Sequence, residues 1–162
     1  MLSASYNSSL VFLSFLVAIL ASYTALNLAG RINSLRGKNI LGWLTVGAGA
    51  MGVGIWSMHF IGMLAFQLPI PLSYDFQISA LSLIIAVLAS GFALWQINRP
   101  QLPVTHLVVS AIIMGFAIAA MHYTGMAALR MSPAIEYDIF LFIASIAIAV
   151  LASGVACLLY TS

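Results

Sequence analysis

The segment Trp56–Met63 reads WSMHFIGM, and the segment Ala120–Met126 reads AMHYTGM, so Met-His-aromatic-x-Gly-Met occurs twice in a chain of 162 residues. The histidines of the two copies are 63 positions apart. Each copy lies inside a long apolar run, where an ionisable side chain is costly and indicates a functional site. The repetition of this motif decides how the rest of the sequence is interpreted.

The composition predicts a membrane protein. Hydrophobic residues make up 64% of the chain and charged residues 5%, whereas a soluble domain has roughly 25% charged residues. Runs long enough to cross about 30 Å of hydrocarbon are Ser8–Gly30, Ile40–Phe66, Phe76–Ile97, Val104–Leu129 and Ile139–Tyr160. These runs lack the alternation of barrel strands, so we predict an all-α membrane protein with five transmembrane helices. The net charge of +2 is too small to indicate nucleic-acid binding.

Other residues recur in step with the motif. Tyr6, Tyr74 and Tyr137 each precede an odd-numbered run, at offsets of 68 and then 63 positions. The repeating unit is therefore a helical hairpin within a single domain, with repeat 1 at about 6–73, repeat 2 at about 74–136 and an incomplete repeat 3 at about 137–162. A third Met-His pair would have its histidine near position 185, so we expect this chain to belong to a longer, seven-helix domain.

Charged residues in the loops predict the orientation. The first and third loops hold basic residues without an acid, namely Arg31, Arg36, Lys38 and Arg99. The positive-inside rule places these loops and the C-terminus in the cytoplasm and the N-terminus outside. Arg130, which shares the fourth loop with two acidic residues, fits this orientation poorly. Asp75 and Asp138 stand at helix starts, where we expect them to be N-caps.

The motif suits a soft metal ion. His59 and Met63 lie one turn apart on one helix face, as do His122 and Met126. Both motifs come near the outer end of an outward-running helix, so they share a depth. Imidazole and thioether ligands together favour copper, especially Cu(I). The predicted metal ligands are Met58, His59, Met63, Met121, His122 and Met126.

The two copies differ after the histidine. The first copy has Phe60 and Ile61 where the second has Tyr123 and Thr124. The hydroxyl groups therefore cannot be required in both copies. We predict that Tyr123 and Thr124 support the site from behind the metal ligands, with Tyr123 hydrogen-bonding a ligand or a supporting group, and that Thr124 could instead simply hydrogen-bond between helices. Gly62 and Gly125 are expected to allow close approach of a neighbouring helix.

Other interpretations of the same residues remain open. The methionines could fill gaps between helices, with each histidine hydrogen-bonded at an interface. Tandem hairpins are also found in transporters, which suggests a metal conduit, and His59 and His122 could be axial ligands of a haem. The G-x-G-x-x-G at Gly47, Gly49 and Gly52 follows no strand, so it indicates helix packing instead of a dinucleotide site. No catalytic triad or paired carboxylate is found, so we expect no enzymatic activity from this chain.

The sequence is similar to a known family. MHFIGM, MHYTGM, the SYTAL stretch of the first run and the Tyr-Asp pairs resemble the MHYT family of bacterial integral-membrane sensor domains, along essentially the whole chain. The resemblance implies three such motifs near the outer face of the cytoplasmic membrane, which have been proposed to bind copper and to sense O₂, CO or NO. It also implies a cytoplasmic partner domain such as a diguanylate cyclase, a cyclic-di-GMP phosphodiesterase or a histidine kinase. Two of the three motifs are present here.

Overall fold

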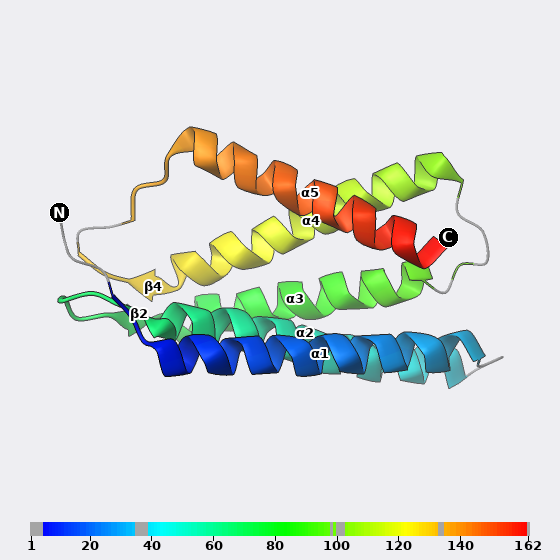
Figure 1. Cartoon of the computed structure of the whole chain (residues 1–162), viewed down its shortest axis with the longest axis horizontal. Helices are drawn as coiled ribbons and strands as arrows, with labels where there is room; N and C mark the ends of the chain where they lie inside the picture. Colours follow the sequence, from blue (N-terminus) through cyan, green and yellow to red (C-terminus); the bar gives the residue numbers. More distant parts are fainter. Residues whose placement is uncertain (1–4, 35–38, 98, 100–102, 133–134, 162) are drawn as a thin grey trace.

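The computed structural model describes residues 5–34, 39–97, 99, 103–132 and 135–161. The helices are α1 Ser8–Ser34, α2 Asn39–Ala65, α3 Phe76–Ile97, α4 Val104–Ala127 and α5 Ile139–Thr161 (Figure 1). Each contains a stretch long and apolar enough to cross a membrane. The prediction of an all-α protein with five membrane-spanning helices is therefore confirmed. Arg36 and Lys38, which contributed to the predicted orientation, lie outside the described residues.

Short strands close each hairpin at one end of the molecule. They are β1 Ser5–Tyr6, β2 Phe66–Gln67, β3 Ser73–Tyr74 and β4 Leu129–Arg130. β1 pairs antiparallel with β2, and β3 pairs in the same way with β4. The apolar runs predicted to end at Phe66 and Leu129 thus end as helices at Ala65 and Ala127, and their last residues join strands. This end of the bundle is called the strand end below.

Each of the two hairpins is closed by an equivalent backbone hydrogen bond, and the two bonds are related by the offsets of the sequence repeat. The N–H of Asn7 donates to the carbonyl of Ala65 at 2.9 Å, and the N–H of Asp75 donates to the carbonyl of Ala128 at 2.8 Å. These donors are 68 positions apart and these acceptors are 63 positions apart, the same offsets as the repeated tyrosines and motifs. The chain is therefore a tandem arrangement of equivalent hairpins.

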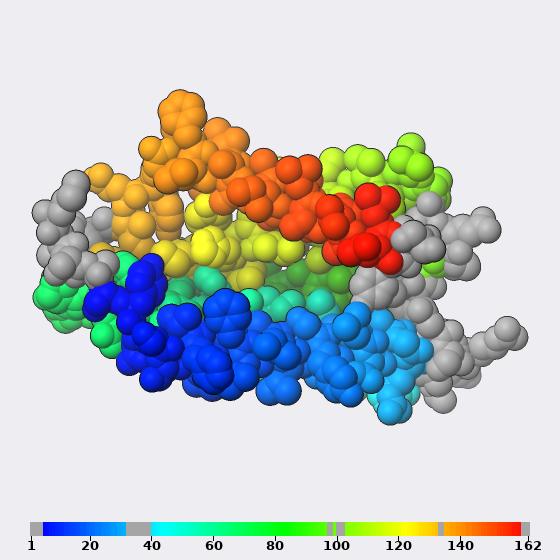
Figure 2. All heavy atoms as spheres, viewed as in Figure 1, coloured from blue at the N-terminus to red at the C-terminus, as the bar shows by residue number. Residues whose placement is uncertain are grey.

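Each helix packs along the next helix in the sequence, and α3 with α4 joins the two hairpins. α1, α2 and α3 lie together, and α5 crosses α4 obliquely on the side of the molecule away from α1 (Figure 1). The space-filling view shows α1 and α5 along the two flanks of this face, with α4 recessed between them (Figure 2). The ends of α1 and α3 and the starts of α2 and α4 meet opposite the strands, and this is called the loop end.

Glycines mark where helices cross most closely. A Cβ at Gly52 would lie 2.6 Å from the Cα of Val87, and a Cβ at Gly115 would lie 2.5 Å from the Cα of Val150. Both pairs are related by the 63-residue offset. Small residues at such contacts are expected in lipid, because close backbone packing replaces the hydrophobic effect as the force between helices. The G-x-G-x-x-G therefore contributes a packing glycine at Gly52, whereas Gly49 faces open space.

Three helices begin with the same side-chain cap. The Oδ1 atoms of Asn7, Asp75 and Asp138 accept hydrogen bonds from the backbone N–H groups two and three residues later, at 2.8 to 3.3 Å. The predicted N-cap role of the two aspartates is confirmed, and Asn7 is the equivalent residue of the first repeat. Each cap satisfies N–H groups that a helix start otherwise leaves without partners.

Arg130, which fitted the charge pattern poorly, is paired. Its Nη2 atom donates to Oδ2 of Asp75 at 2.7 Å. The hydrogen bond from Arg130 holds the pKa of the Asp75 carboxyl below its usual value, and the N–H of Ile78 acts in the same direction. The fourth loop therefore carries an arginine whose charge is neutralised by an aspartate of the second loop.

Candidate metal site

The two histidines of the motifs meet between the hairpins. The imidazole of His59 on α2 lies against the imidazole of His122 on α4, with ring centroids 4.9 Å apart and ring planes 59° apart. Both residues occupy the last two turns of their helices, toward the strand end. α2 and α4 run in the same direction and carry their motifs at equivalent positions. The two histidines therefore lie at the same depth in the bundle.

A glycine makes this meeting possible. A Cβ at Gly125 would lie 2.8 Å from Nε2 and 3.0 Å from Cδ2 of His59, so the His59 ring occupies the space that a side chain would need. Gly62 is different, because the nearest atom to its Cβ position is Oγ of Ser14 at 3.7 Å, an ordinary contact. The expected close approach is therefore found at Gly125 and not at Gly62.

His59 presents a buried nitrogen at this crossing. Its Nε2 atom is inaccessible to solvent and makes no hydrogen bond of normal geometry among the residues that the structure describes, although the imidazole has a weaker polar contact with the backbone of His122. A buried polar nitrogen without a partner is costly, and such groups in native proteins commonly indicate a ligand or an ion. His122, in contrast, is exposed.

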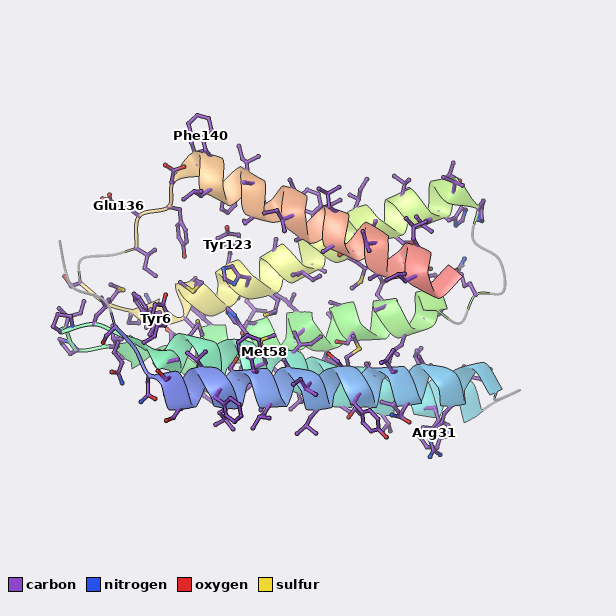
Figure 3. All side chains as sticks on the ribbon, viewed as in Figure 1. Tyr6, Arg31, Met58, Tyr123, Glu136 and Phe140 are labelled. Carbon is purple, nitrogen blue, oxygen red and sulfur yellow. The ribbon has the colours of Figure 1, made fainter. Side chains whose placement is uncertain are left out.

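The predicted methionine ligands do not all gather at one point. Met63 is 8% exposed, and its Cε atom lies 3.9 Å from the Cβ position of Gly125, beside His59. Met121 is buried at 6% exposure. Met58, labelled in Figure 3, is half-buried, and its backbone carbonyl accepts a hydrogen bond from Ser14 on α1. Met126 lines a hollow of about 420 Å³ between α4 and α5. The structure thus brings His59, His122 and Met63 together.

Tyr123 supports His122 from the side of α5. Its ring packs edge-on against the His122 ring, with centroids 5.0 Å apart. Its hydroxyl shares a hydrogen bond of 2.6 Å with Oγ of Ser145 on α5, and Figure 3 shows Tyr123 on the side of α4 that faces α5. The tyrosine therefore links the motif of one hairpin to the first helix of the next. Thr124 is half-buried, and its support of the site stays a prediction.

The aromatic residue that follows the histidine makes the same kind of contact in both copies of the motif. Phe60 packs on Tyr74 with ring centroids 5.1 Å apart, and Tyr123 packs on Tyr137 at 5.5 Å. Burial raises the pKa of both contacted tyrosines, so both phenols remain neutral at physiological pH. An aromatic ring is used in both copies, whereas the hydroxyl acts in the second copy alone.

A series of serines near the motifs was missed by the sequence analysis. Ser14, Ser82 and Ser145 follow the same offsets of 68 and 63 positions and lie on the odd-numbered helices. The Oγ of Ser14 donates to the carbonyl of Met58 at 2.9 Å, and the Oγ of Ser82 accepts from Nε1 of Trp56 at 3.0 Å. Their recurrence in step with the tyrosines was a signal in the sequence that could have identified them.

The donor atoms at the crossing define the chemistry that it can perform. Within the described ranges, no group of three or more His, Cys, Asp or Glu side chains comes together. A metal between α2 and α4 would therefore depend on two imidazoles and on thioether sulfur. This donor set suits copper and excludes the oxygen-rich coordination that magnesium and calcium require.

The fold and the motifs define a class of protein, namely a multi-pass α-helical membrane protein built from tandem hairpins with repeated Met-His motifs. The family model MHYT, described as "Bacterial signalling protein N terminal repeat", matches residues 2–42, 52–110 and 115–162. The chain belongs to the MHYT family. The second and third matches begin inside α2 and α4, so the family phases its repeat differently from the hairpins used here, whose bounds stay a prediction.

Curated relatives are signalling proteins. The chain is 58% identical over 156 residues to the bifunctional diguanylate cyclase/cyclic di-GMP phosphodiesterase MucR of Pseudomonas aeruginosa, covering 96% of this chain and 23% of the relative. It is 46% identical to the cyclic di-GMP phosphodiesterase NbdA of the same organism, covering 91% and 19%. It is 38% identical to the signaling protein YkoW of Bacillus subtilis, covering 93% and 19%. The chain thus spans about a fifth of the length of these relatives. No solved structure matches the chain.

Proposed function

We propose that this chain is a membrane sensory module that holds copper through His and Met side chains near the outer membrane face. Binding of a diatomic gas such as O₂, CO or NO, or a change of redox state, would then be signalled to a cytoplasmic output domain. The observation that carries the proposal is the contact of His59 with His122, in which the buried Nε2 of His59 makes no hydrogen bond of normal geometry among the described residues.

The residues present fit such an ion. His59, His122 and Met63 would hold it at the crossing, whereas the role of the other motif methionines, Met58, Met121 and Met126, as further thioether ligands stays a prediction. Copper would supply a redox-active centre able to accept a small exogenous ligand. The role of the protein in this proposal would be to orient both imidazoles, since Gly125 lies against His59 and the ring of Tyr123 packs on His122.

The position of the site suggests how a signal leaves it. The crossing joins α2 of one hairpin to α4 of the next, so any change in the separation of the two imidazoles shifts one hairpin against the other. Packed helices transmit such shifts along their length. The described arginines Arg31 and Arg99 lie at the loop end, which supports placing that end in the cytoplasm and the strand end outside.

The relatives support the nature of the output. MucR and NbdA carry cyclic di-GMP activities in their names, and this chain corresponds to about a fifth of each. A bacterial cytoplasmic-membrane location with such a cytoplasmic partner domain is the arrangement we propose for the full-length protein. The proposed copper ion is based on the donor atoms of the crossing, and the proposed gas ligand is based on the resemblance to the MHYT sensor domains.

The packing favours copper over the alternatives. A haem held by both histidines would separate the imidazoles by a macrocycle, whereas here the rings are 4.9 Å apart and Gly125 lies against His59. The hairpins repeat in the same direction, unlike the inverted repeats on which many transporters are built. No observation specifically favours a haem protein or a metal conduit.

Copper retention tests the proposal. The chain and the full-length protein would be purified from copper-supplied membranes as wild type, as a His59→Ala/His122→Ala double variant and as His106→Ala, which changes a histidine far from the crossing. We expect copper in the wild type and in His106→Ala and its loss in the double variant. Equal copper in all three, or none in the full-length wild type, would contradict the metal site, and a Soret band would point to haem instead.

A further inference from the structure

A second hollow lies at the loop end, far from the histidine pair. It has a volume of about 480 Å³ and opens between the end of α3 and the start of α4. Its polar lining comes from both helices and from Arg99, two positions after the end of α3, and consists of Gln96, Arg99, Thr105, His106 and Ser110. A cavity of this size is large enough for part of a small organic ligand.

The hollow contains a positive charge that no acidic side chain neutralises. The guanidinium carbon of Arg99 lies 3.8 Å from the centroid of the Trp95 ring, which holds the group over the indole. All three acidic residues of the chain, Asp75, Glu136 and Asp138, lie toward the strand end, at the other end of α3 and α5. Figure 3 shows this separation, with Glu136 at the end opposite Arg31. Arg99 is therefore available to an anion from outside the chain.

Buried polar groups form the floor of the hollow. Gln96 is 6% exposed and Ser110 is 4% exposed, and Nε2 of Gln96 donates to Oγ of Ser110. The Ser110 hydroxyl in turn donates to the carbonyl of His106 at 2.7 Å. Buried polar side chains are tolerated when they are hydrogen-bonded, and this chain of bonds ties α3 to α4 beside Arg99.

The first hairpin lacks this polar arrangement. The repeat equivalents of Arg99 and His106 are Arg31 and Trp43, and the Arg31 guanidinium carbon lies 6.0 Å from the Trp43 ring centroid. The equivalents of Gln96 and Ser110 are Leu28 and Gly47. An indole thus occupies the place where the second hairpin has the smaller imidazole. Because the first hairpin has the arginine but not the other polar residues, the polar hollow is specific to the second hairpin and does not accompany every arginine at this end of the bundle.

The rest of the hollow is apolar and faces outward. Phe92, Val109 and Ile113 line it, and the side chains of Val109 and Ile113 are exposed. In a membrane-spanning helix pair these side chains would contact acyl chains. A ligand that matches both parts has an anionic head beside Arg99 and an apolar tail along α4.

We propose that this hollow binds an anionic phospholipid, with its headgroup phosphate on Arg99 and His106 and an acyl chain along Val109 and Ile113. Arginine matches phosphate geometry through paired N–H donors, and the imidazole of His106 offers a further N–H. Basic pockets between membrane helices are known to suit such headgroups. The proposal is independent of copper binding at the other end of the bundle.

Native mass spectrometry of the purified chain tests this assignment. Phosphatidylglycerol would be titrated into chain reconstituted in phosphatidylcholine nanodiscs, and the lipids retained after release would be counted. We expect one phosphatidylglycerol per chain in preference to phosphatidylcholine. Arg99→Gln should weaken this retention by about tenfold or more, as expected for loss of a hydrogen bond to a charged group. Arg31→Gln, the repeat-equivalent control, should leave retention unchanged.

Further variants keep the test decisive if Arg99→Gln folds poorly. Arg99→Lys keeps the charge but not the paired N–H donors, so it should retain more phosphatidylglycerol than Arg99→Gln. Val109→Trp keeps Arg99 but fills the acyl part of the hollow and should lose the lipid. Equal retention of the two lipids, or equal losses in Arg31→Gln and Arg99→Gln, would overturn the proposal. Displacement of the lipid by millimolar inorganic phosphate would also overturn it and would assign the hollow to a free anion.

Discussion

Gly125 on α4 lies so close to His59 on α2 that a Cβ at position 125 would be 2.8 Å from the imidazole Nε2. The contact between the two Met-His motifs therefore depends on a residue without a side chain. The backbone of α4 at Gly125 and the ring of His122, also on α4, both contact His59. These contacts limit the positions that the imidazole nitrogen of His59 can take.

Replacing Gly125 by alanine is expected to displace the His59 ring. If copper binds at the crossing, its affinity should fall by about ten- to a hundredfold, the range seen when groups that orient metal ligands are changed. Competition with a chromophoric Cu(I) chelator would measure this. Gly62→Ala is the matched control, since the nearest atom to its Cβ position is 3.7 Å away, and its affinity should equal that of the wild type. The same loss in both variants would contradict a specific role for Gly125.

The repeated helix crossings should be sensitive to a single methyl group. Gly52→Ala and Gly115→Ala place a Cβ at 2.6 and 2.5 Å from the Cα atoms of Val87 and Val150, so each should lower the free energy of unfolding by about 1 to 3 kcal/mol. Gly49→Ala meets nothing within 4 Å and should be neutral or slightly stabilising. Unfolding by denaturing detergent in bicelles would compare the three. A destabilised Gly49→Ala with unaffected Gly52→Ala would show that these crossings are placed wrongly.

Tyr123→Phe should separate the aromatic ring from its hydroxyl. The variant loses the hydrogen bond to Ser145 and should be less stable by about 0.5 to 1.5 kcal/mol, measured by the same unfolding assay. The ring against His122 remains, and the first copy already has Phe60 at this position, so copper retention should not change. A variant that loses copper while keeping its stability would assign the hydroxyl a direct part in the site.

The Asp75 pair with Arg130 should make stability depend on pH. Because the folded-state pKa of Asp75 is lowered, the ionised carboxylate stabilises the folded state above its unfolded pKa of about 3.9, and this contribution is lost as the pH falls through the lower folded-state value. Asp75→Asn can still cap α3, as Asn7 caps α1, so it removes the ion pair selectively.

Thermal unfolding between pH 6 and pH 3 would measure this effect. The wild type should lose more stability in acid than Asp75→Asn, whose curve should be flatter. Asp138→Asn is the control, because Asp138 caps α5 and no ion pair is seen for it among the described residues. Identical acid profiles for the wild type and Asp75→Asn would show that the pair contributes nothing measurable in the membrane.

Much of the fold was predictable because lipid imposes simple conditions. Apolar runs of sufficient length must form helices there, and the five helices were found where such runs occur. The strands were not predicted, because two residues are too short to show alternation. The pairing of Arg130 with Asp75, 55 positions apart, was also invisible, since the charge of each loop was considered alone.

The sequence predicted which residues belong to the candidate site better than it predicted which of them lie together in space. Repetition singled out both histidines, and the structure places their rings in contact. Helical spacing placed Met126 on the face of His122, yet Met126 lines the hollow between α4 and α5, because that face is shared by two neighbours. The spacing of residues along one helix predicts which side chains share a face of that helix. It does not predict which neighbouring helix packs against that face.

The sequence by itself determined the helices, the tandem repeat and the family, because hydrophobicity and residue offsets are properties of the chain alone. Only the tertiary structure decided that α2 and α4 meet at His59 and His122, that Gly125 is the closest contact there and Gly62 is not, and that Arg99 borders a hollow. These relationships depend on how each helix is rotated against its neighbours. Close crossings between neighbouring helices, such as Gly52 of α2 against Val87 of α3 and Gly115 of α4 against Val150 of α5, constrain that rotation, and no single helix contains this information.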